Sequence, residues 1–340
     1  MPPRKKGKSA PPVSGIDRMG ALPDYMLQHV LSFLPAQAAV RTCMLARRWR
    51  DLWRSTRGLR IVGLHGPQRA QYLRVFVEHL LILRKRTDLD TVKIKFDLFE
   101  DDDEPYLKLW TRFAVMCKVR ALTIHLDGPS YLYLDHMPLV TRHLRTLDLE
   151  GVGLDEDFVG FGSCSALEEL KMDSCERGFS GATPILENMP LLETACVYLG
   201  NECYCQDNNL LLLGGISSAK HLELTSEFRK FTIVPDLKHR PTFSKLKTLL
   251  LNEYWCEDPD MDPLAYILKN SPVLEKLILH LYTKGSNHKV EMKGNYSTTQ
   301  RSSVISEHLN IVELRCNVVD ENILKVLRFM STFNIRFSFE

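Results

Sequence analysis

A short pattern of apolar residues recurs along most of this chain, and it constrains the fold more than any other feature. The pattern is apolar-x-x-apolar-x-apolar, and its last residues alternate as they do in a β-strand. Nine copies follow one another, with their first, fourth and sixth positions at Leu89/Val92/Ile94, Val119/Leu122/Ile124, Leu144/Leu147/Leu149, Leu167/Leu170/Met172, Leu192/Ala195/Val197, Ala219/Leu222/Leu224, Leu246/Leu249/Leu251, Leu274/Leu277/Leu279 and Leu309/Val312/Leu314. The chain therefore repeats one strand-forming unit many times.

The spacing of the copies indicates the kind of repeat. Successive copies begin 23 to 35 residues apart, mostly in or near the roughly 20–29 residues of a leucine-rich repeat. Segments between copies, such as residues 72–84 and 264–269, can form one or two helical turns. Stacked strand–helix units give a curved solenoid with a parallel sheet on its concave side. With Leu59/Val62/Leu64 as an opening unit, we expect an α/β solenoid of about ten units over residues 58–340.

The pleat of the strands predicts which residues line the concave side. The fifth and seventh residues of each copy should point away from the core. In chain order they are Lys93/Lys95, Thr123/His125, Asp148/Glu150, Lys171/Asp173, Cys196/Tyr198, Glu223/Thr225, Leu250/Asn252, Ile278/His280 and Glu313/Arg315. We call these residues the concave row. It is mostly polar until Leu250 and Ile278 add apolar surface.

We expect a binding site for a partner protein in the C-terminal half of this row. Interface hot spots favour aromatic and apolar anchors within a polar rim, whereas the exposed charges of the earlier units contribute little. The predicted contacts are Tyr198, Leu250, Asn252, Ile278 and His280. The alternative is that Leu250 and Ile278 pack beneath an inter-repeat loop such as residues 282–300.

The chain before the repeats divides in two. Residues 1–16 are rich in Pro, Gly, Ser and Lys, so we expect a disordered basic tail. Its basic cluster is either a nuclear localisation signal or simple solubilising charge. Residues 17–57 instead predict three short helices, with more apolar surface than about forty residues can bury alone. The surplus implies a partner, which is either another chain or the rest of this one.

Apolar residues recur at helical spacing in each of these three segments. The first segment has a stripe at Leu27, Val30, Leu31 and Leu34, and Pro35 ends it. The second carries Val40 and Cys43. The third has a stripe at Leu45, Trp49, Leu52 and Trp53, with four Arg on its other faces.

Residues 22–61 resemble the F-box of plant F-box/leucine-rich-repeat proteins, particularly the FBD-type group expanded in grasses. The matching features are Leu22-Pro23-Asp24, Leu31-Ser32-Phe33-Leu34-Pro35, Val40-Arg41-Thr42, Leu45-Ala46-Arg47-Arg48-Trp49 and Leu52-Trp53. Residues 270–281 and 308–333 resemble the repeat and FBD region of the same group. Cys43 and Ala46 stand where many relatives have Ser, and both are small enough to leave the packing undisturbed.

The resemblance implies a substrate receptor of a Skp–cullin–F-box ubiquitin ligase. The F-box at residues 17–57 would bind a Skp-family adaptor, and through it a cullin, while the repeats would hold the unknown protein to be ubiquitylated. The adaptor-facing residues that it implies are Leu22, Pro23, Leu27, Val30, Leu31, Phe33, Leu34, Pro35, Val40, Trp49 and Trp53. The alternative function is a leucine-rich-repeat binding scaffold without a role in ubiquitylation.

Composition and motifs argue against other classes of function. The formal net charge of +2 favours neither nucleic acid nor a membrane surface as partner. No phosphate-binding loop, nucleophile elbow or zinc-protease motif occurs, so we expect no enzyme, no catalytic residue and no cofactor. Nine cysteines without a C-x-x-C pair predict free thiols and no metal site.

Two further features set expectations about location and surface. The chain has no apolar run long enough to span a bilayer and no secretory signal, so we expect a cytoplasmic and/or nuclear protein. The acidic run of residues 100–104 predicts a solvated loop between two repeats.

Overall fold

The computed structural model describes most of the repeats and of the helical segment before them. The described residues are 19, 21–63, 67–133, 141–154, 164–173, 176–177, 189–199, 209–226, 241–252, 255–256, 262–281, 306–316, 321–331 and 336–339. The expected tail at residues 1–16 lies outside them, as does the loop at 282–300.

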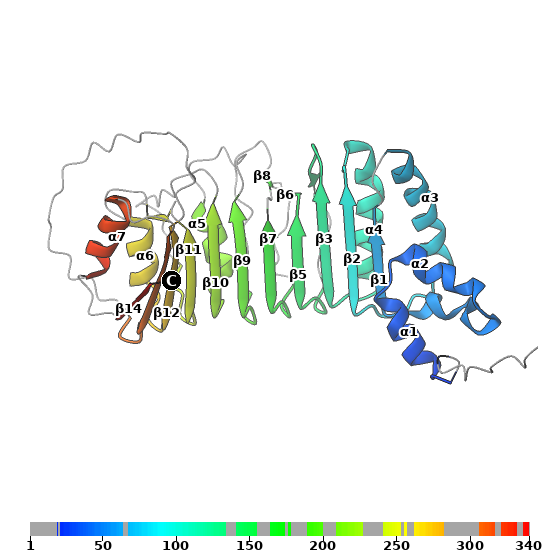
Figure 1. Cartoon of the computed structure of the whole chain (residues 1–340), viewed down its shortest axis with the longest axis horizontal. Coiled ribbons are helices and arrows are strands. Elements are labelled where there is room, and N and C mark those ends of the chain that lie inside the picture. The colour runs from blue at the N-terminus through cyan, green and yellow to red at the C-terminus, as the bar shows by residue number, and fades with distance from the viewer. Residues whose placement is uncertain are drawn as a thin grey trace, which may run out of the picture.

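Within the described residues, one large parallel sheet contains eleven strands whose spatial order follows the chain (Figure 1). These strands are β1 (Gly58–Val62), β2 (Thr91–Asp97), β3 (Ala121–Asp127), β5 (Thr146–Glu150), β7 (Glu169–Asp173), β9 (Thr194–Leu199), β10 (His221–Ser226), β11 (Thr248–Asn252), β12 (Lys276–Leu281), β13 (Ile311–Cys316) and β14 (Arg336–Phe339). A small second sheet joins β4 (Leu132–Tyr133), β6 (Val152–Leu154) and β8 (Glu176–Arg177). The order of neighbours confirms the predicted solenoid with a curved parallel sheet.

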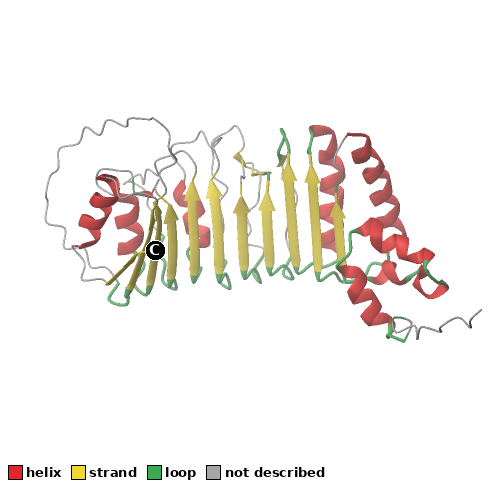
Figure 2. Cartoon of the chain, viewed as in Figure 1, coloured by secondary structure: helices red, strands yellow, loops and turns green. Residues whose placement is uncertain are grey.

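Within the described residues, five helices connect strands of the large sheet. They are α3 (Pro67–Leu83), α4 (Glu104–Met116), α5 (Asn209–Ile216), α6 (Asp262–Lys269) and α7 (Glu321–Ser331). In Figure 2, α4 and α5 lie behind the strands, so the near face of the sheet is left without helices there. The rings of Phe96 on β2 and Trp110 on α4 lie 6.5 Å apart, which joins the strand layer to the helix layer.

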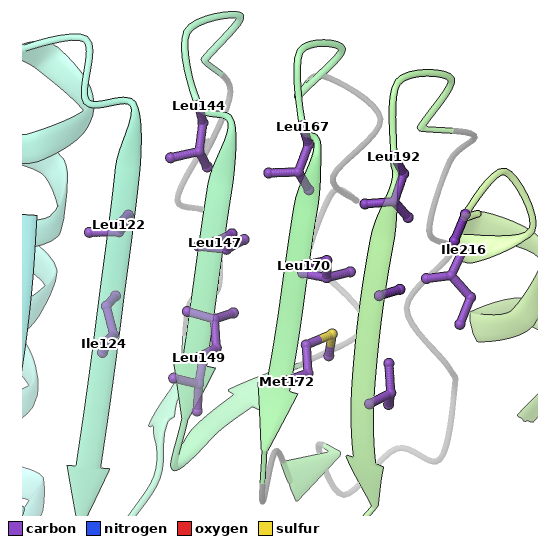
Figure 3. Close-up of a cluster of buried hydrophobic side chains, with 14 of the residues drawn as sticks. Leu122, Ile124, Leu144, Leu147, Leu149, Leu167, Leu170, Met172, Leu192 and Ile216 are labelled. Atoms are coloured by element: carbon purple, nitrogen blue, oxygen red, sulfur yellow. The ribbon is translucent and has the colours of Figure 1, made fainter. Parts of the chain in front are cut away.

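The register of the sheet confirms the repeating pattern. Leu147 on β5 pairs with Leu122 on β3 and with Leu170 on β7, so equivalent positions of successive copies stand side by side. Every apolar position of the nine copies is buried. Figure 3 shows a central part of this core as columns of side chains that run across the strands. A slip of one residue would turn each column to the solvent, so the pattern fixes the register.

The opening unit differs from its prediction by three residues. Leu59 and Ile61 pair with Val92 and Ile94, so they occupy the fourth and sixth positions of the pattern. The first position is Thr56, which is 2% exposed. Its hydroxyl lies 3.1 Å from the carbonyl oxygens of Trp53 and Gly58 and donates there. Because that donor is satisfied, a polar residue can occupy this buried position. The apolar repeat pattern is therefore not recognisable in the sequence at this position.

The segment before the repeats contains the expected first two helices but not the third. They are α1 (Asp24–Ser32) and α2 (Ala36–Arg41), and α2 continues into the 3-10 turn η1 (Thr42–Met44). The predicted third helix is two 3-10 segments, η2 (Arg47–Arg50) and η3 (Leu52–Ser55). The Trp53 indole donates to the carbonyl oxygen of Arg50 over 3.0 Å, and the Arg54 amide bonds to Asp51 instead. The Arg50 carbonyl oxygen, which the Arg54 amide would bind in an α-helix, is therefore occupied by the Trp53 indole.

Two contacts join this helical segment to the first repeat. The Arg84 guanidinium is buried and donates to the Thr56 hydroxyl over 2.9 Å and to the Thr56 carbonyl oxygen. Burial lowers the pKa of Arg84 to about 10, so it stays charged at neutral pH. Gly58 lies so close to α1 that a Cβ atom there would be 2.6 Å from the Ser32 Cβ. Helices and solenoid therefore pack directly on each other.

The acidic run at residues 100–104 is not the plain loop that we expected. Asp101–Asp103 form a 3-10 turn (η4) that leads into α4, and a capping box joins Glu100 to Asp103. Asp103 is buried and accepts a hydrogen bond of 2.6 Å from the Arg74 Nε on α3. Glu100, Asp101 and Asp102 are exposed, and Glu104 is half-buried. The run therefore serves to anchor α3 against α4.

Candidate functional site

The helical segment has an outer apolar side as well as a core. Leu27 and Leu31 of α1 are buried, and Trp49, Leu52 and Trp53 are buried with them. In the described part of residues 19–45, seven large apolar side chains are between 42% and 85% exposed: Met19, Tyr25, Met26, Val30, Phe33, Met44 and Leu45. Single exposed apolar residues are common, but seven in so short a stretch indicate a contact surface.

The residues that we expected to face an adaptor divide between the two sides. Pro23, Val30, Phe33 and Pro35 are exposed, and Leu22, Leu34 and Val40 are half-buried. Leu27, Leu31, Trp49 and Trp53 lie in the core of the chain itself, so they support the outer surface from within. Direct contact with an adaptor stays a prediction, and it applies to the exposed members.

Sequence reasoning missed five of the seven exposed apolar residues, Met19 and Tyr25 among them. Met26, Met44 and Leu45 were not among the expected contacts, although Met26, Val30 and Phe33 recur at i, i+4 and i+7. Spacing alone does not tell which of two adjacent apolar stripes on α1 faces inwards. We call Met26, Val30, Met44 and Leu45 the outer apolar surface.

An ion pair holds the helical segment in shape. The Arg48 guanidinium on η2 lies 2.7 Å from the Asp24 carboxylate at the start of α1, and it also donates to the Leu22 carbonyl oxygen. Arg48 thereby joins the last part of the segment to its first helix. The outer apolar surface is thus carried on elements that are tied to each other.

The concave row faces away from the core as predicted, with one exception. All of its residues are half-buried or exposed except Glu313 on β13, which is buried. The Glu313 carboxylate lies 2.6 Å from the Lys276 Nζ and 2.7 Å from the Arg315 Nε. Hydrogen bonds from Lys276 and then Arg315 hold the pKa of Glu313 below its usual range. These two cations cover the carboxylate, which explains the burial.

The predicted binding residues of the concave row lie on three strands, β9, β11 and β12. Leu250 and Ile278 are partners on β11 and β12, and so are Asn252 and His280. Tyr198 on β9 pairs with Thr225 on β10, so one strand separates it from Asn252. All five predicted residues are half-buried. The structure brings four of them together, and Tyr198 lies at one side.

The His280 ring is uncharged at neutral pH, although charged side chains lie near it. Burial, followed by the positive charge of Arg315, lowers the pKa of His280, so the ring is neutral at neutral pH. A neutral imidazole beside Ile278 can form a hydrogen bond without the desolvation that a full charge requires. This part of the row therefore suits an apolar partner with polar groups at its rim.

The middle of the concave row holds polar groups that pair with one another. The His125 Nε2 lies 2.9 Å from the Asp148 carboxylate, and the Cys196 thiol donates to the Glu223 carboxylate over 3.7 Å. Burial, and then Glu223, raises the pKa of Cys196 to about 11. The thiol is therefore protonated at neutral pH and lacks the thiolate that a nucleophile needs.

A hollow that the sequence did not predict lies at the N-terminal end of the row. It has a volume of about 590 Å³ and lies between α1 and the strands β1, β2 and β3, partly open to solvent. Tyr25 on α1 and Phe33 directly after α1 line one side of it, and Arg60 and Lys93 line it from the sheet. Phe33, an expected adaptor contact, therefore borders this hollow.

Further features bear on membrane, metal and disulfide chemistry. No helix in the described ranges is long and apolar enough to cross a bilayer. Among the same residues no cluster of three His, Cys, Asp or Glu side chains could hold a metal ion. The six described cysteines form no disulfide: Cys43, Cys117, Cys164, Cys196, Cys256 and Cys316. Cys175, Cys203 and Cys205 lie outside the described residues.

Comparison with known proteins agrees with this architecture. Residues 20–60 match the model of the F-box domain. The chain is 26% identical to an F-box/FBD/LRR-repeat protein of Arabidopsis thaliana over 59% of its length, and 25% identical to an F-box/LRR-repeat protein of the same plant over 63%. It is also 25% identical to the MEIOTIC F-BOX protein MOF of Oryza sativa subsp. japonica, over 78% of its length and 71% of the rice protein.

The matches to the two Arabidopsis proteins cover 53% and 44% of those proteins, so the chain spans about half the length of these relatives. The F-box match coincides with the helices that carry the outer apolar surface. The names of the two Arabidopsis relatives include the leucine-rich repeat. The sheet that follows the helices in this chain has the parallel stacking of strands that is typical of that repeat. With an F-box match at residues 20–60 that leads into a solenoid of leucine-rich-repeat type, this chain is similar to the F-box/leucine-rich-repeat proteins of plants.

Proposed function

We propose that this chain is the substrate receptor of a Skp–cullin–F-box ubiquitin ligase. Its F-box would bind a Skp-family adaptor, and through it a cullin, while the solenoid holds the protein to be ubiquitylated. The observation that carries this proposal is the outer apolar surface, since Met26, Val30, Met44 and Leu45 are exposed within the F-box match. The receptor itself would be non-catalytic and would need no cofactor.

The physical argument concerns apolar area that the fold leaves in water. Burial of such area contributes about 25 cal/mol per Å², and an ordinary stable interface removes roughly 800 Å² per partner from solvent. The chain's own core already takes Leu27, Leu31 and Trp49, so an adaptor would bury a different set of side chains. The contacts that we propose are therefore the outer apolar surface together with Pro23 and Pro35, while Phe33, which lines the hollow beside α1, is left out of them.

Calorimetric titration of the whole chain with a purified Skp-family adaptor tests this role. A Val30→Glu/Met44→Glu variant should lose adaptor binding, because each change places a charge in an apolar contact. Ile82→Glu is the matched control, because Ile82 is 81% exposed on α3, outside the F-box match. We expect the control to bind as the wild type does. Unchanged affinity of the folded double variant would refute the proposal.

The same measurement separates the alternative function. A leucine-rich-repeat scaffold without a ubiquitylation role would capture its partner and yet bind no adaptor. The F-box match and the exposed apolar side chains favour the ligase. We further propose that the protein works in the cytosol and/or the nucleus, where such a ligase would act. Fluorescence microscopy of a tagged chain tests that location.

For the substrate, we propose contacts in the C-terminal half of the concave row. Tyr198, Leu250, Asn252, Ile278 and His280 supply an aromatic ring, two apolar side chains and neutral polar groups. The test uses the Val30→Glu/Met44→Glu chain as bait for proximity labelling, because captured substrates should escape degradation. A further Leu250→Lys/Ile278→Lys change should reduce capture, and capture that is undiminished would place the contacts elsewhere.

A further inference from the structure

The hollow beside the F-box has a wall and a floor of different chemistry. Its wall is formed by Tyr25 on α1 and by Phe33, the residue that follows α1, and both side chains are exposed. The His29 ring meets the Phe33 ring edge-on, with centroids 4.9 Å apart, so the wall has a defined aromatic orientation. The floor is formed by the sheet, with Arg60 on β1, Lys93 on β2 and Thr123 on β3. The volume of about 590 Å³ lies in the roughly 300–1,000 Å³ range of sites that take ligands.

The floor is positively charged. Three cationic side chains and one carboxylate line the hollow, so their formal charges sum to +2. Arg57 is already neutralised, because its Nη2 lies 2.7 Å from the Asp90 carboxylate. Lys93 forms no ion pair with any residue that the structure describes, and neither does Arg60. The excess charge therefore belongs to Arg60 and Lys93.

These two cations stand next to each other. Arg60 and Lys93 are paired residues of β1 and β2, and Arg60 is anchored by a 3.2 Å hydrogen bond from its Nη1 to the Phe33 carbonyl oxygen. By contrast, the charges just before these strands are paired: Arg57 lies 2.7 Å from Asp90, as Lys220 lies 2.5 Å from Glu193 and Lys247 lies 2.8 Å from Glu275 just before later strands. Two adjacent cations without such partners repel each other and favour an anion between them.

The wall changes how much these charges contribute. On an open sheet face, exposed ion pairs add little because water screens them. Here α1 stands over one side of Arg60 and Lys93, so an anion in the hollow would lose part of its surrounding water and would interact more strongly. Tyr25 and Phe33 offer apolar contact to neighbouring groups of the same ligand.

We propose that the hollow binds an acidic, extended peptide segment of the captured protein, with a carboxylate on Arg60 and Lys93 and an apolar side chain against Tyr25 and Phe33. Lys93 and Thr123 belong to the concave row, so such a segment can continue along the sheet. This inference rests on the proposed role as a substrate receptor, and it names the chemistry of the substrate at one end of the concave face.

Fluorescence anisotropy with the whole chain tests the inference. The probe is a labelled library of hexapeptides, each with two glutamates and one leucine or phenylalanine. Matched libraries replace the glutamates with glutamines or lysines. We expect binding of the glutamate library only, with an affinity that falls as salt is raised. Absence of binding, or equal binding of the glutamine library, would overturn the inference.

Variants locate the binding. Lys93→Glu should lower the affinity for the glutamate library about tenfold or more, because it replaces an attraction by a repulsion. Arg60→Gln should lower this affinity less, since the glutamine side chain can still donate to the Phe33 carbonyl oxygen. Lys269→Glu is the control, because Lys269 is exposed on α6 near the other end of the solenoid. An equal loss in the control, or no loss in Lys93→Glu, would contradict the assignment.

Two cross-checks separate this inference from the proposed ligase role. The folded Lys93→Glu chain should bind the adaptor as the wild type does, and the Val30→Glu/Met44→Glu chain should still bind the glutamate library. If a saturating adaptor displaces the peptide, the hollow belongs to the adaptor interface and the inference is wrong. If the chain binds no adaptor, the ligase role fails while the peptide measurement still decides the chemistry of the hollow.

Discussion

The buried carboxylate of Asp103 offers a sharp test of how the first repeats are held together. Asp103 is 1% exposed, and its carboxylate accepts from the Arg74 guanidinium on α3 and, over 3.2 Å, from the Glu100 amide. We predict that Asp103→Ala destabilises the chain by about 2–4 kcal/mol. The neighbouring Asp102 is exposed, so Asp102→Ala is the matched control and should stay within about 0.5 kcal/mol of the wild type.

The magnitude follows from the two contacts that are lost. A hydrogen bond to a charged group contributes about 1.5–3 kcal/mol, and a helix-capping contact about 1 kcal/mol. Breaking a fully buried ion pair costs about 3–5 kcal/mol. The Arg74 side chain is 19% exposed and also lies 5.1 Å from the Tyr106 ring centroid, so water and the ring compensate part of that loss. We therefore expect a value below the upper end of that range.

Urea unfolding followed by circular dichroism measures the effect, and hydrogen exchange of α3 and α4 shows whether it is local. Asp103→Asn keeps an acceptor for the Glu100 amide, so it should lower the free energy of unfolding by about half as much as Asp103→Ala does. Replacing both partners, as Arg74→Met/Asp103→Leu, should recover part of the loss, because no buried charge is left alone. Equal stability of the Asp102 and Asp103 alanine variants would refute the reasoning.

Three further predictions concern the junction and the thiols. Gly58→Ala should lower the free energy of unfolding by more than about 1 kcal/mol, because the new Cβ would be 2.7 Å from the Ser32 carbonyl oxygen; Gly214→Ala, whose Cβ meets nothing within 4 Å, should not be destabilising. Alkylation of Cys196 at pH 8 should be slow and should accelerate as pH rises towards its pKa of about 11, and Glu223→Gln should lower that pKa; a fast, pH-independent reaction would contradict the assignment. Thiol titration of the unfolded protein under reducing conditions should find all nine cysteines, and elemental analysis of protein that was never exposed to a chelator should find no stoichiometric zinc; stable disulfides or bound zinc would contradict the prediction.

The strands of the solenoid could be predicted because the same three apolar positions recur in each unit and share one register. Leu122, Leu147 and Leu170 are each identified by position alone, and each is buried in the same column. The pattern failed where a local hydrogen bond replaced an apolar side chain, as at Thr56. It also failed at the last strand, where β14 pairs Phe337 with Val312 after a unit that begins on a polar residue. Side-chain hydrogen bonds of this kind depend on the folded backbone, so sequence spacing does not reveal them.

The hollow beside the F-box could not be predicted for a different reason. The repeat pattern predicts correctly that Lys93 lies on the outward face of a strand. We expected its charge to contribute little to binding, because a flat sheet face is open to water. That weighting ignores α1, whose approach to β1 is set by the absence of a side chain at Gly58 against Ser32. Neither residue belongs to a repeating pattern, and the contact joins two segments that are separate in the sequence. How strongly Arg60 and Lys93 can bind an anion therefore depends on α1, which belongs to the F-box. When the solenoid is considered alone, both side chains are predicted to be ordinary solvated charges.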